Sequence, residues 1–261
     1  MKINHPKRKS LKEVKKFFNK KYPNIIKILN DRIEKKLTKP PYPGIYYYLY
    51  YLYNLVKLNK RLVILEFGSG WSSLIFIIAL NELLKENSKL LQKMKINKDH
   101  EIYILENSKK YLNFTKKRIN KYFKNSNNKQ FCKINYLHSD VYMSKFNNRI
   151  VTEYQKLPLC NPDFIYLDGP DQFNVKGQVN GFSTRHKNLM PMVSDLLKIE
   201  YFLMPGTIIL VDGRAANARF LKDHFKRKWK YKYDSTNDFH TFFLMEKSLG
   251  KINSKILKFF N

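Results

Sequence analysis

The sequence is poor in small residues and in cysteine. Its 261 residues include 9 glycines, 4 alanines and 2 cysteines. Cys132 and Cys160 cannot build a disulfide framework or a four-cysteine zinc site, so we interpret both as packing residues. No apolar run reaches the roughly 18 residues of a membrane-spanning helix, and no membrane span is predicted. The first residues lack the apolar core and cleavage site of a secretory signal, so we expect a cytoplasmic protein.

Acidic residues are also few. The chain has 21 Asp and Glu against 50 Lys and Arg, which gives a formal net charge of +29. Such an excess is typical of proteins that bind nucleic acid or anionic membranes. However, 41 of the basic residues are lysine and 9 are arginine, whereas base readout depends on the planar arginine fork. We therefore interpret the charge as the bias of an A/T-rich genome, with a nucleic-acid surface as the alternative.

The first 60 residues are predicted to form a helical extension. Residues 1–40 have the pattern of two short amphipathic helices broken near Pro23, and a proline-rich breaker follows over residues 39–44. Residues 45–60 are rich in tyrosine and predict one more helix. We interpret this helix as packed on the core, with a lid or a substrate wall as the alternative.

Residues 61–247 are predicted to form one α/β domain. Two late strands, at residues 231–233 and 241–245, are predicted to form a hairpin. Residues 85–100 are predicted to be a polar insertion, and residues 248–261 a basic tail. Short apolar runs predict earlier strands at residues 62–65, 102–105, 134–137, 164–167 and 207–211, and helices at residues 71–84, 109–123, 189–203 and 215–228. The alternation predicts a doubly wound, mostly parallel seven-stranded sheet with a terminal antiparallel hairpin strand and helices on both faces.

A glycine turn follows the first predicted strand, and in such sheets ligands bind beyond the carboxyl ends of strands. The turn reads Glu66-Phe67-Gly68-Ser69-Gly70-Trp71-Ser72 and opens a helix. Its backbone N–H groups suit an anion such as a carboxylate, and the Glu66 carboxylate suits an ammonium group. Ser73 stands where the dinucleotide fingerprint has its third glycine, which disfavours a nicotinamide, flavin or nucleotide-sugar enzyme.

Acidic residues follow the other parallel strands as well. Glu106 ends the second strand, where an acid accepts hydrogen bonds from two ribose hydroxyls, and Asp140 follows the third, where it can meet an adenine edge. Asp168 and Asp212 end the fourth and fifth strands. Together these acids predict a ligand site along one edge of the sheet.

These residues resemble a known family. Residues 66–72 look like the glycine-rich first motif of class I S-adenosylmethionine-dependent methyltransferases, with Ser72 in place of the usual last glycine. Residues 166–169 and 205–212 resemble the family motifs at the fourth and fifth strands, and the hairpin agrees with its reversed last strand. The resemblance, which covers about residues 61–247, implies S-adenosylmethionine as the cofactor. It places the cofactor on Glu66, Gly68, Ser69, Gly70, Trp71, Ser72, Glu106, Asp140 and Asp168.

Methyl transfer from a sulfonium depends mainly on positioning, and a hydroxyl acceptor also needs a group that takes its proton. Asp168 and Asp212 are the first candidates and His186 the third, with turn chemistry or a solvated loop as the alternatives. Paired strand-end acids also resemble the divalent-metal site of catechol-type O-methyltransferases. Because Gly213 stands where that family has Asn, a metal is possible but not favoured, and no metal ligand is predicted.

The long polar loop over residues 170–187 is predicted to select the substrate. Arg185 and Arg214 flank it and are candidates for clamping an acidic group of the substrate, with surface pairing as the alternative. The sequence thus favours a methyltransferase that O-methylates a small molecule or a glycan. An RNA methyltransferase that uses the basic surface, and a non-catalytic binding module, are the alternatives. The acceptor and the oligomeric state are not determined by the sequence.

Overall fold

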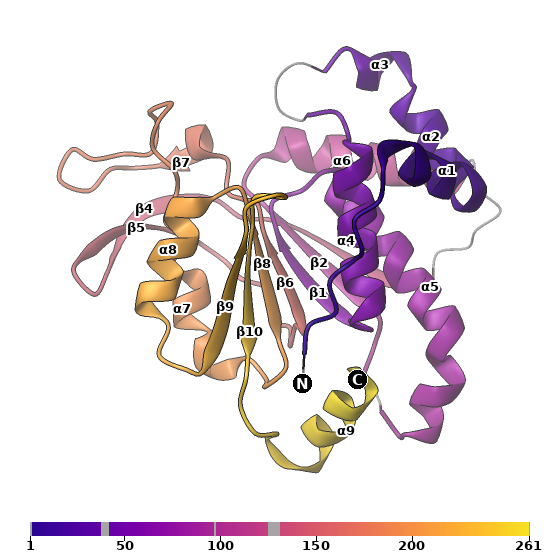
Figure 1. The fold of residues 1–261 in the computed structure, drawn as a ribbon. Coiled ribbons are helices and arrows are strands. Elements are labelled where there is room, and N and C mark those ends of the chain that lie inside the picture. Colours follow the sequence, from indigo (N-terminus) through magenta and orange to yellow (C-terminus); the bar gives the residue numbers. More distant parts are fainter. Residues whose placement is uncertain (1, 38–41, 97, 125–130, 261) are drawn as a thin grey trace.

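The computed structural model describes residues 2–37, 42–96, 98–124 and 131–260. Among these residues, seven strands form a sheet in the order β3-β2-β1-β6-β8-β10-β9, in which β10 alone is reversed (Figure 1). The strands are β1 (Val63–Phe67), β2 (Glu101–Glu106), β3 (Lys133–His138), β6 (Phe164–Leu167), β8 (Ile208–Asp212), β9 (Trp229–Asp234) and β10 (Phe239–Leu244). The predicted doubly wound sheet with a terminal antiparallel strand is confirmed.

The register of the parallel strands puts their carboxyl ends at one edge. Phe67, the last residue of β1, pairs with Leu105 of β2 and with Leu167 of β6. Leu167 in turn pairs with Val211 of β8. The acids that follow these strands in the sequence therefore lie along the same edge of the sheet.

Helices cover both faces of the sheet, as predicted (Figure 1). On one face, α4 (Tyr46–Leu58), α5 (Trp71–Lys93) and α6 (Lys109–Lys124) bury their apolar side chains against inward-facing strand residues such as Ile64. On the other face, α7 (Asp195–Lys198) and α8 (Ala215–His224) pack against Leu65 and its neighbours. The alternation of Ile64 and Leu65 between two cores is the period-2 pattern of a strand buried on both sides.

A second sheet of three strands was not predicted. It consists of β4 (Val141–Phe146), β5 (Arg149–Tyr154) and β7 (Val175–Lys176), in the order β5-β4-β7. Asn147 and Asn148 join β4 to β5 with φ values of 48° and 60°, which is the left-handed pair that a two-residue hairpin requires. This Asn-Asn pair was the available sequence signal, but β4 carries polar residues that hide its strand pattern.

Two other predictions about helices were wrong. Residues 189–203 were predicted to form one helix. They form instead a non-helical segment over residues 189–194, the short helix α7 and the 3-10 helix η2 (Glu200–Phe202). Val193 is held in an isolated β-bridge with Thr152, because the Thr152 N–H donates to the Met192 carbonyl and the Ser194 N–H donates to the Thr152 carbonyl. The predicted polar insertion after residue 84 is instead the second half of α5, which buries Leu91.

The N-terminal segment forms three helices, α1 (Leu11–Lys21), α2 (Pro23–Leu29) and α3 (Arg32–Lys35). The predicted break near Pro23 is confirmed, because Pro23 is the first residue of α2, a position where its missing N–H costs nothing. The short α3 was not predicted, and residues 38–41 of the predicted breaker lie outside the described residues. None of the described helices is both long and apolar enough to cross a bilayer.

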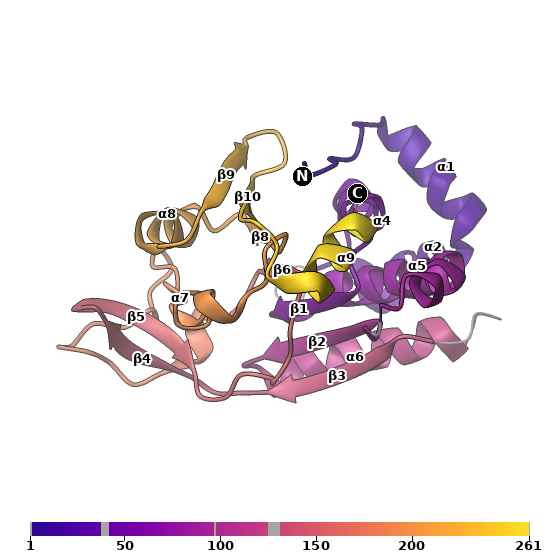
Figure 2. The ribbon, with the colours of Figure 1, turned by 90° about the horizontal axis from the view of Figure 1, so that it is seen from below.

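The basic segment after residue 247 forms α9 (Gly250–Phe260), which packs near the start of β1 (Figure 2). Phe259 and Phe260 are buried there, and the Arg61 guanidinium carbon lies 4.1 Å from the Phe260 ring centroid. Arg61 also donates from Nη1 to the Gly206 carbonyl at 2.7 Å. The division of the chain at residues 60 and 247 stays a prediction.

Candidate active site

The glycine turn between β1 and α5 forms the floor of the site. Gly68 has φ = +106°, a conformation that side chains with a Cβ rarely adopt. A Cβ on Gly169 would lie 2.7 Å from the Gly68 nitrogen, so the turns after β1 and β6 touch through bare backbone. Around Gly70, by contrast, a Cβ would meet no described atom within 4 Å. The turn is therefore closely packed below and open on one side, as a backbone cradle for a ligand has to be.

Glu66 lies beneath this turn and is fully buried. Ser72 donates from its hydroxyl to Glu66 Oε1 at 2.5 Å, whereas Oε2 has no hydrogen-bond partner in the described part of the chain. Burial raises the pKa of Glu66 to about 8, although the hydrogen bond from Ser72 opposes the shift. A buried carboxyl oxygen without a partner is costly unless something binds it. Glu66 is thus ready to accept a donor from a ligand.

Glu106 and Ser69 are brought together, as the sequence predicted from their strand ends. The Ser69 hydroxyl donates to Glu106 Oε2 at 2.8 Å, and the Ser108 N–H donates to Oε1 at 2.8 Å. Glu106 is only 3% exposed, and burial raises its pKa to about 7. The end of β2 and the glycine turn therefore present one continuous polar surface.

Asp168 and Asp212 lie at neighbouring strand ends, and Arg214 contacts Asp168 and the turn that follows it. Arg214 Nε lies 3.8 Å from Asp168 Oδ1, and its Nη1 and Nη2 donate to the carbonyls of Pro170 and Asp168. Burial, opposed by the hydrogen bond from Tyr48 and by the charge of Arg214, raises the pKa of Asp212 to about 6. Desolvation by the surrounding protein, and then the Asp212 charge, raise the pKa of Asp168, although 48% of that side chain is open to solvent.

Two tyrosines that sequence reasoning did not single out complete the Asp212 environment. Tyr48 of α4 donates its hydroxyl to Asp212 Oδ2 at 2.5 Å, and Tyr166 of β6 donates to the same oxygen at 2.8 Å. The tyrosine-rich run predicted α4, but all its tyrosines look alike in the sequence. The helix packs on the core and also forms a wall of the site through Tyr48.

Trp71, the first residue of α5, links the site to the N-terminal helices. Its ring nitrogen donates to Glu34 Oε2 at 3.1 Å, and Arg118 of α6 donates from Nε to Glu34 Oε1 at 2.8 Å. The Arg118 guanidinium carbon also lies 4.6 Å from the Trp71 ring centroid. These three buried side chains hold α3 against the start of α5.

Asp140, His186 and Arg185 lie in other surroundings. Asp140 pairs with Lys176 of β7 at 2.7 Å, and this hydrogen bond lowers its pKa. His186 is exposed and accepts from the Asn188 N–H through Nδ1, while Arg185 Nε donates to the Val175 carbonyl. Within the described ranges, no hydrogen bond or ion pair joins His186 or Arg185 to the two strand-end aspartates.

Two further residues near this edge were missed by sequence reasoning. Asn107, after β2, exchanges two hydrogen bonds of 3.1 and 3.0 Å with the backbone of Asp171 in the loop after β6. Tyr154 of β5 is 6% exposed, packs edge-on against Phe67, and has a hydroxyl with no partner among the described residues. Burial, followed by the Glu106 charge, raises the pKa of Tyr154. Tyr154 belongs to the second sheet, so no strand-end rule could have found it.

No group of three or more His, Cys, Asp or Glu in the described part of the chain is arranged to hold a metal ion. Neither Cys132 nor Cys160 takes part in a disulfide bond, and Cys132 is buried. Burial raises the pKa of each thiol to about 12.

No family model and no curated protein matches the sequence. Solved structures align with it along most of their length. An O-methyltransferase from Bacillus cereus in complex with SAH is 14% identical over 92% of both chains, with a TM-score of 0.40. SAH-bound methyltransferase PaMTH1 of Podospora anserina is 12% identical over 94% of this chain and 100% of its own, with a TM-score of 0.47. O-methyltransferase TomG from Streptomyces achromogenes, in complex with SAM, is 12% identical over 90% and 96%, with a TM-score of 0.44.

At such identities and TM-scores an alignment does not assign an activity, so function has to be argued from the site. The strand order, the reversed β10 and the glycine turn after β1 define a Rossmann-like fold, which is the fold that the resemblance in the sequence motifs implied.

Proposed function

We propose that this chain is an S-adenosylmethionine-dependent methyltransferase that O-methylates a small-molecule or glycan acceptor. The observation that carries the proposal is Glu66, fully buried beside an open glycine turn with Oε2 lacking a partner among the described residues. Such a pocket fits a ligand that carries an amino acid group. The carboxylate of that group would bind at the turn, and its ammonium group would bind Glu66.

The residues present fit the cofactor. The Gly70 N–H already donates to the Ser73 hydroxyl at 3.1 Å. The backbone N–H groups of Ser69 and Trp71, at the start of α5, suit the carboxylate of the cofactor's methionine part, while Glu66 takes the ammonium group. Glu106 takes the ribose hydroxyls, because its two oxygens lie at the end of β2 beside the turn. The remaining contacts of the proposed set come from Gly68, Ser72, Asp140 and Asp168. When bound, the cofactor supplies a methyl group on a positively charged sulfur.

Asp212 is the proposed proton acceptor. Its Oδ2 is held by the hydroxyls of Tyr48 and Tyr166, so the carboxylate has a fixed orientation. A pKa of about 6 leaves it ionised at neutral pH yet basic enough to take a proton. Asp212 would take the proton of the acceptor hydroxyl when that hydroxyl is methylated. Arg214 fixes Asp168 and its turn, and Arg185 stays a candidate for an acidic group on the acceptor.

Calorimetric titration tests the proposal. We expect the wild-type chain to bind S-adenosylmethionine and S-adenosylhomocysteine with micromolar Kd and not to bind NAD. Glu106→Ala should abolish binding of both, whereas the matched control Glu86→Ala, on the exposed outer part of α5, should not change it. A folded wild-type chain that binds neither compound contradicts the proposal. Binding without methyl transfer to any acceptor would favour the non-catalytic module instead.

A further inference from the structure

A surface that is both apolar and basic lies where the parallel strands begin, at the opposite end of the sheet from the proposed active site. Figures 1 and 2 place α7 and α9 at this end. Four large apolar side chains are exposed there: Tyr201 by 71%, Phe202 by 82%, Leu249 by 54% and Ile252 by 77%. We call this surface the lower face.

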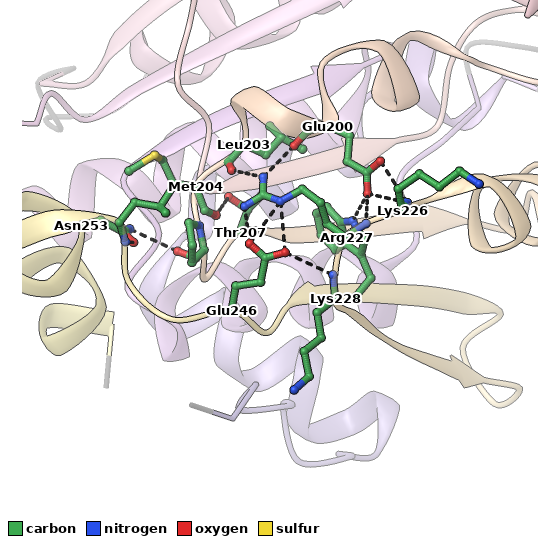
Figure 3. A network of polar contacts seen from close by, with 12 residues as sticks. Glu200, Leu203, Met204, Thr207, Lys226, Arg227, Lys228, Glu246 and Asn253 are labelled. Atoms are coloured by element: carbon green, nitrogen blue, oxygen red, sulfur yellow. Dashed lines mark hydrogen bonds and ion pairs between the residues drawn. The ribbon is translucent and has the colours of Figure 1, made fainter.

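The lower face is held together by a polar network (Figure 3). Arg227 donates from Nη1 to the carbonyls of Glu200 at 2.8 Å and Leu203 at 2.5 Å, and from Nη2 to Glu246 Oε2 at 2.6 Å. Asn253 of α9 donates to the Pro205 carbonyl at 3.3 Å. Because these bonds fix η2, the turn after it and the start of α9 together, the exposed apolar groups sit on one rigid surface.

The charge of the lower face is positive. Lys251, Lys255 and Lys258 are exposed at spacings of four and three residues, which places them in one stripe along α9. Residues 247–260 contain four lysines and no acidic residue. Two carboxylates of the polar network are already engaged, since Glu246 pairs with Arg227 and Glu200 accepts backbone N–H groups.

We propose that the lower face binds the surface of an anionic phospholipid bilayer. Phe202 and Ile252 would enter the boundary between headgroups and acyl chains, while the α9 lysines contact the anionic headgroups. The proposal goes beyond the methyltransferase function and leaves the cofactor edge facing away from the membrane. Nucleic acid fits less well, because aliphatic side chains such as Leu249 and Ile252 add nothing to phosphate contacts, and α9 contains no arginine.

Vesicle co-sedimentation tests this directly. We expect the full chain to bind vesicles of phosphatidylcholine with 30% phosphatidylserine at 100 mM NaCl, and not vesicles of phosphatidylcholine alone. The triple variant Lys251→Gln, Lys255→Gln, Lys258→Gln should bind at least about tenfold more weakly. The double variant Phe202→Ser, Ile252→Ser should lose affinity to a similar degree while its attraction to anionic lipid stays dependent on salt.

Matched variants on another face serve as controls. The triple variant Lys12→Gln, Lys16→Gln, Lys20→Gln removes the same charge from exposed positions of α1. Ile33→Ser removes an aliphatic group that is 63% exposed, compared with 77% for Ile252. Equal losses in these controls would overturn the proposal, because the attraction would then be diffuse. Binding of a single-stranded RNA oligonucleotide but not of anionic vesicles would also overturn it. Glu106→Ala should bind vesicles normally, which separates this proposal from that of the methyltransferase.

Discussion

At the scale of single residues, the carboxyl groups of the site differ in how many of their oxygens already accept hydrogen bonds from the protein. Glu106 has both oxygens occupied by hydrogen-bond donors, and Asp212 has two tyrosine hydroxyls on one oxygen. Glu66 has one oxygen without a partner among the described residues. The first two are therefore already oriented without a ligand, whereas Glu66 gains most when a ligand arrives.

Tyr48 tests the orientation of Asp212. Tyr48→Phe removes a hydrogen bond to a charged group, so the pKa of Asp212 should rise above its value of about 6. The free energy of unfolding at pH 8 should fall by about 1.5–3 kcal/mol. Carboxyl carbon NMR titration and denaturant unfolding measure the two effects. Tyr47→Phe, on the same helix, is the control, and an unchanged Asp212 titration in Tyr48→Phe would refute the assigned role.

Tyr154 tests whether an unpartnered hydroxyl belongs to the cofactor site. Tyr154→Phe removes a buried polar atom that bonds to no described residue, so the ligand-free protein should be equally stable or more stable by up to about 1 kcal/mol. If the hydroxyl meets the cofactor, the Kd for S-adenosylmethionine should rise about fivefold. Thermal unfolding and calorimetry separate the effects. An unchanged Kd would make Tyr154 a packing residue only.

At the scale of elements, the N-terminal helices are attached to the α/β fold by a few buried polar contacts. Glu34 on α3, Arg118 on α6 and Trp71 on α5 form a closed unit with side chains almost out of reach of water. A buried pair of this kind adds little net stability over apolar substitutes but makes the loss of one partner costly.

Breaking this unit should therefore show strong coupling. Arg118→Met leaves the Glu34 carboxylate buried without its ion pair and should lower the free energy of unfolding by about 3–5 kcal/mol. The double variant Glu34→Met, Arg118→Met should recover much of that loss, because no unpaired charge remains. Urea unfolding of the single and double variants measures the coupling energy. Additive losses would show that the two side chains act independently.

Elements with a clear apolar pattern were predictable from the sequence, and elements with a polar pattern were not. The apolar runs of β1, β2, β6 and β8 mark short buried strands, so these strands and the acids at their ends were predictable, and the glycine turn with Glu66 and Glu106 came with them. The second sheet was missed because its strands carry polar residues and one of them is only two residues long. Tyr48 and Tyr154 were missed because their proximity to the site arises from tertiary packing alone.

At the scale of the whole molecule, several buried acids hold their protons more tightly in the folded chain than in the unfolded one. The pKa values of Glu66, Glu106 and Asp195 rise to about 8, 7 and 7, and burial is the first cause in each case. Below about pH 4 both states keep these protons, so the groups cost nothing. As the pH rises from about 4 toward 8, the unfolded chain releases these protons while the folded chain still holds them, so the free energy of unfolding falls.

The ligand-free protein should therefore become less stable between pH 5 and 8. Glu66 alone contributes on the order of a few kcal/mol to this loss. Glu66→Gln, which cannot ionise, should flatten the dependence in thermal unfolding scans from pH 5 to 8.5. In the wild type, binding of the cationic cofactor should favour the ionised Glu66, so its affinity should rise with pH and protons should be released. An identical pH slope in Glu66→Gln would contradict this account.

The hydrogen bond from Tyr48 to Asp212 has a consequence for how the protein folds. It joins positions 164 residues apart in the chain, so closing it requires β8 to be in place beside β6 and α4 to be docked on the sheet. Contacts of such long sequence separation form late, because the loop between their ends must be ordered first. A chain that has already formed β1, the glycine turn and α5 would hold part of the proposed cofactor site without a positioned Asp212. If the proposed function is right, cofactor binding should therefore recover before methyl transfer during refolding.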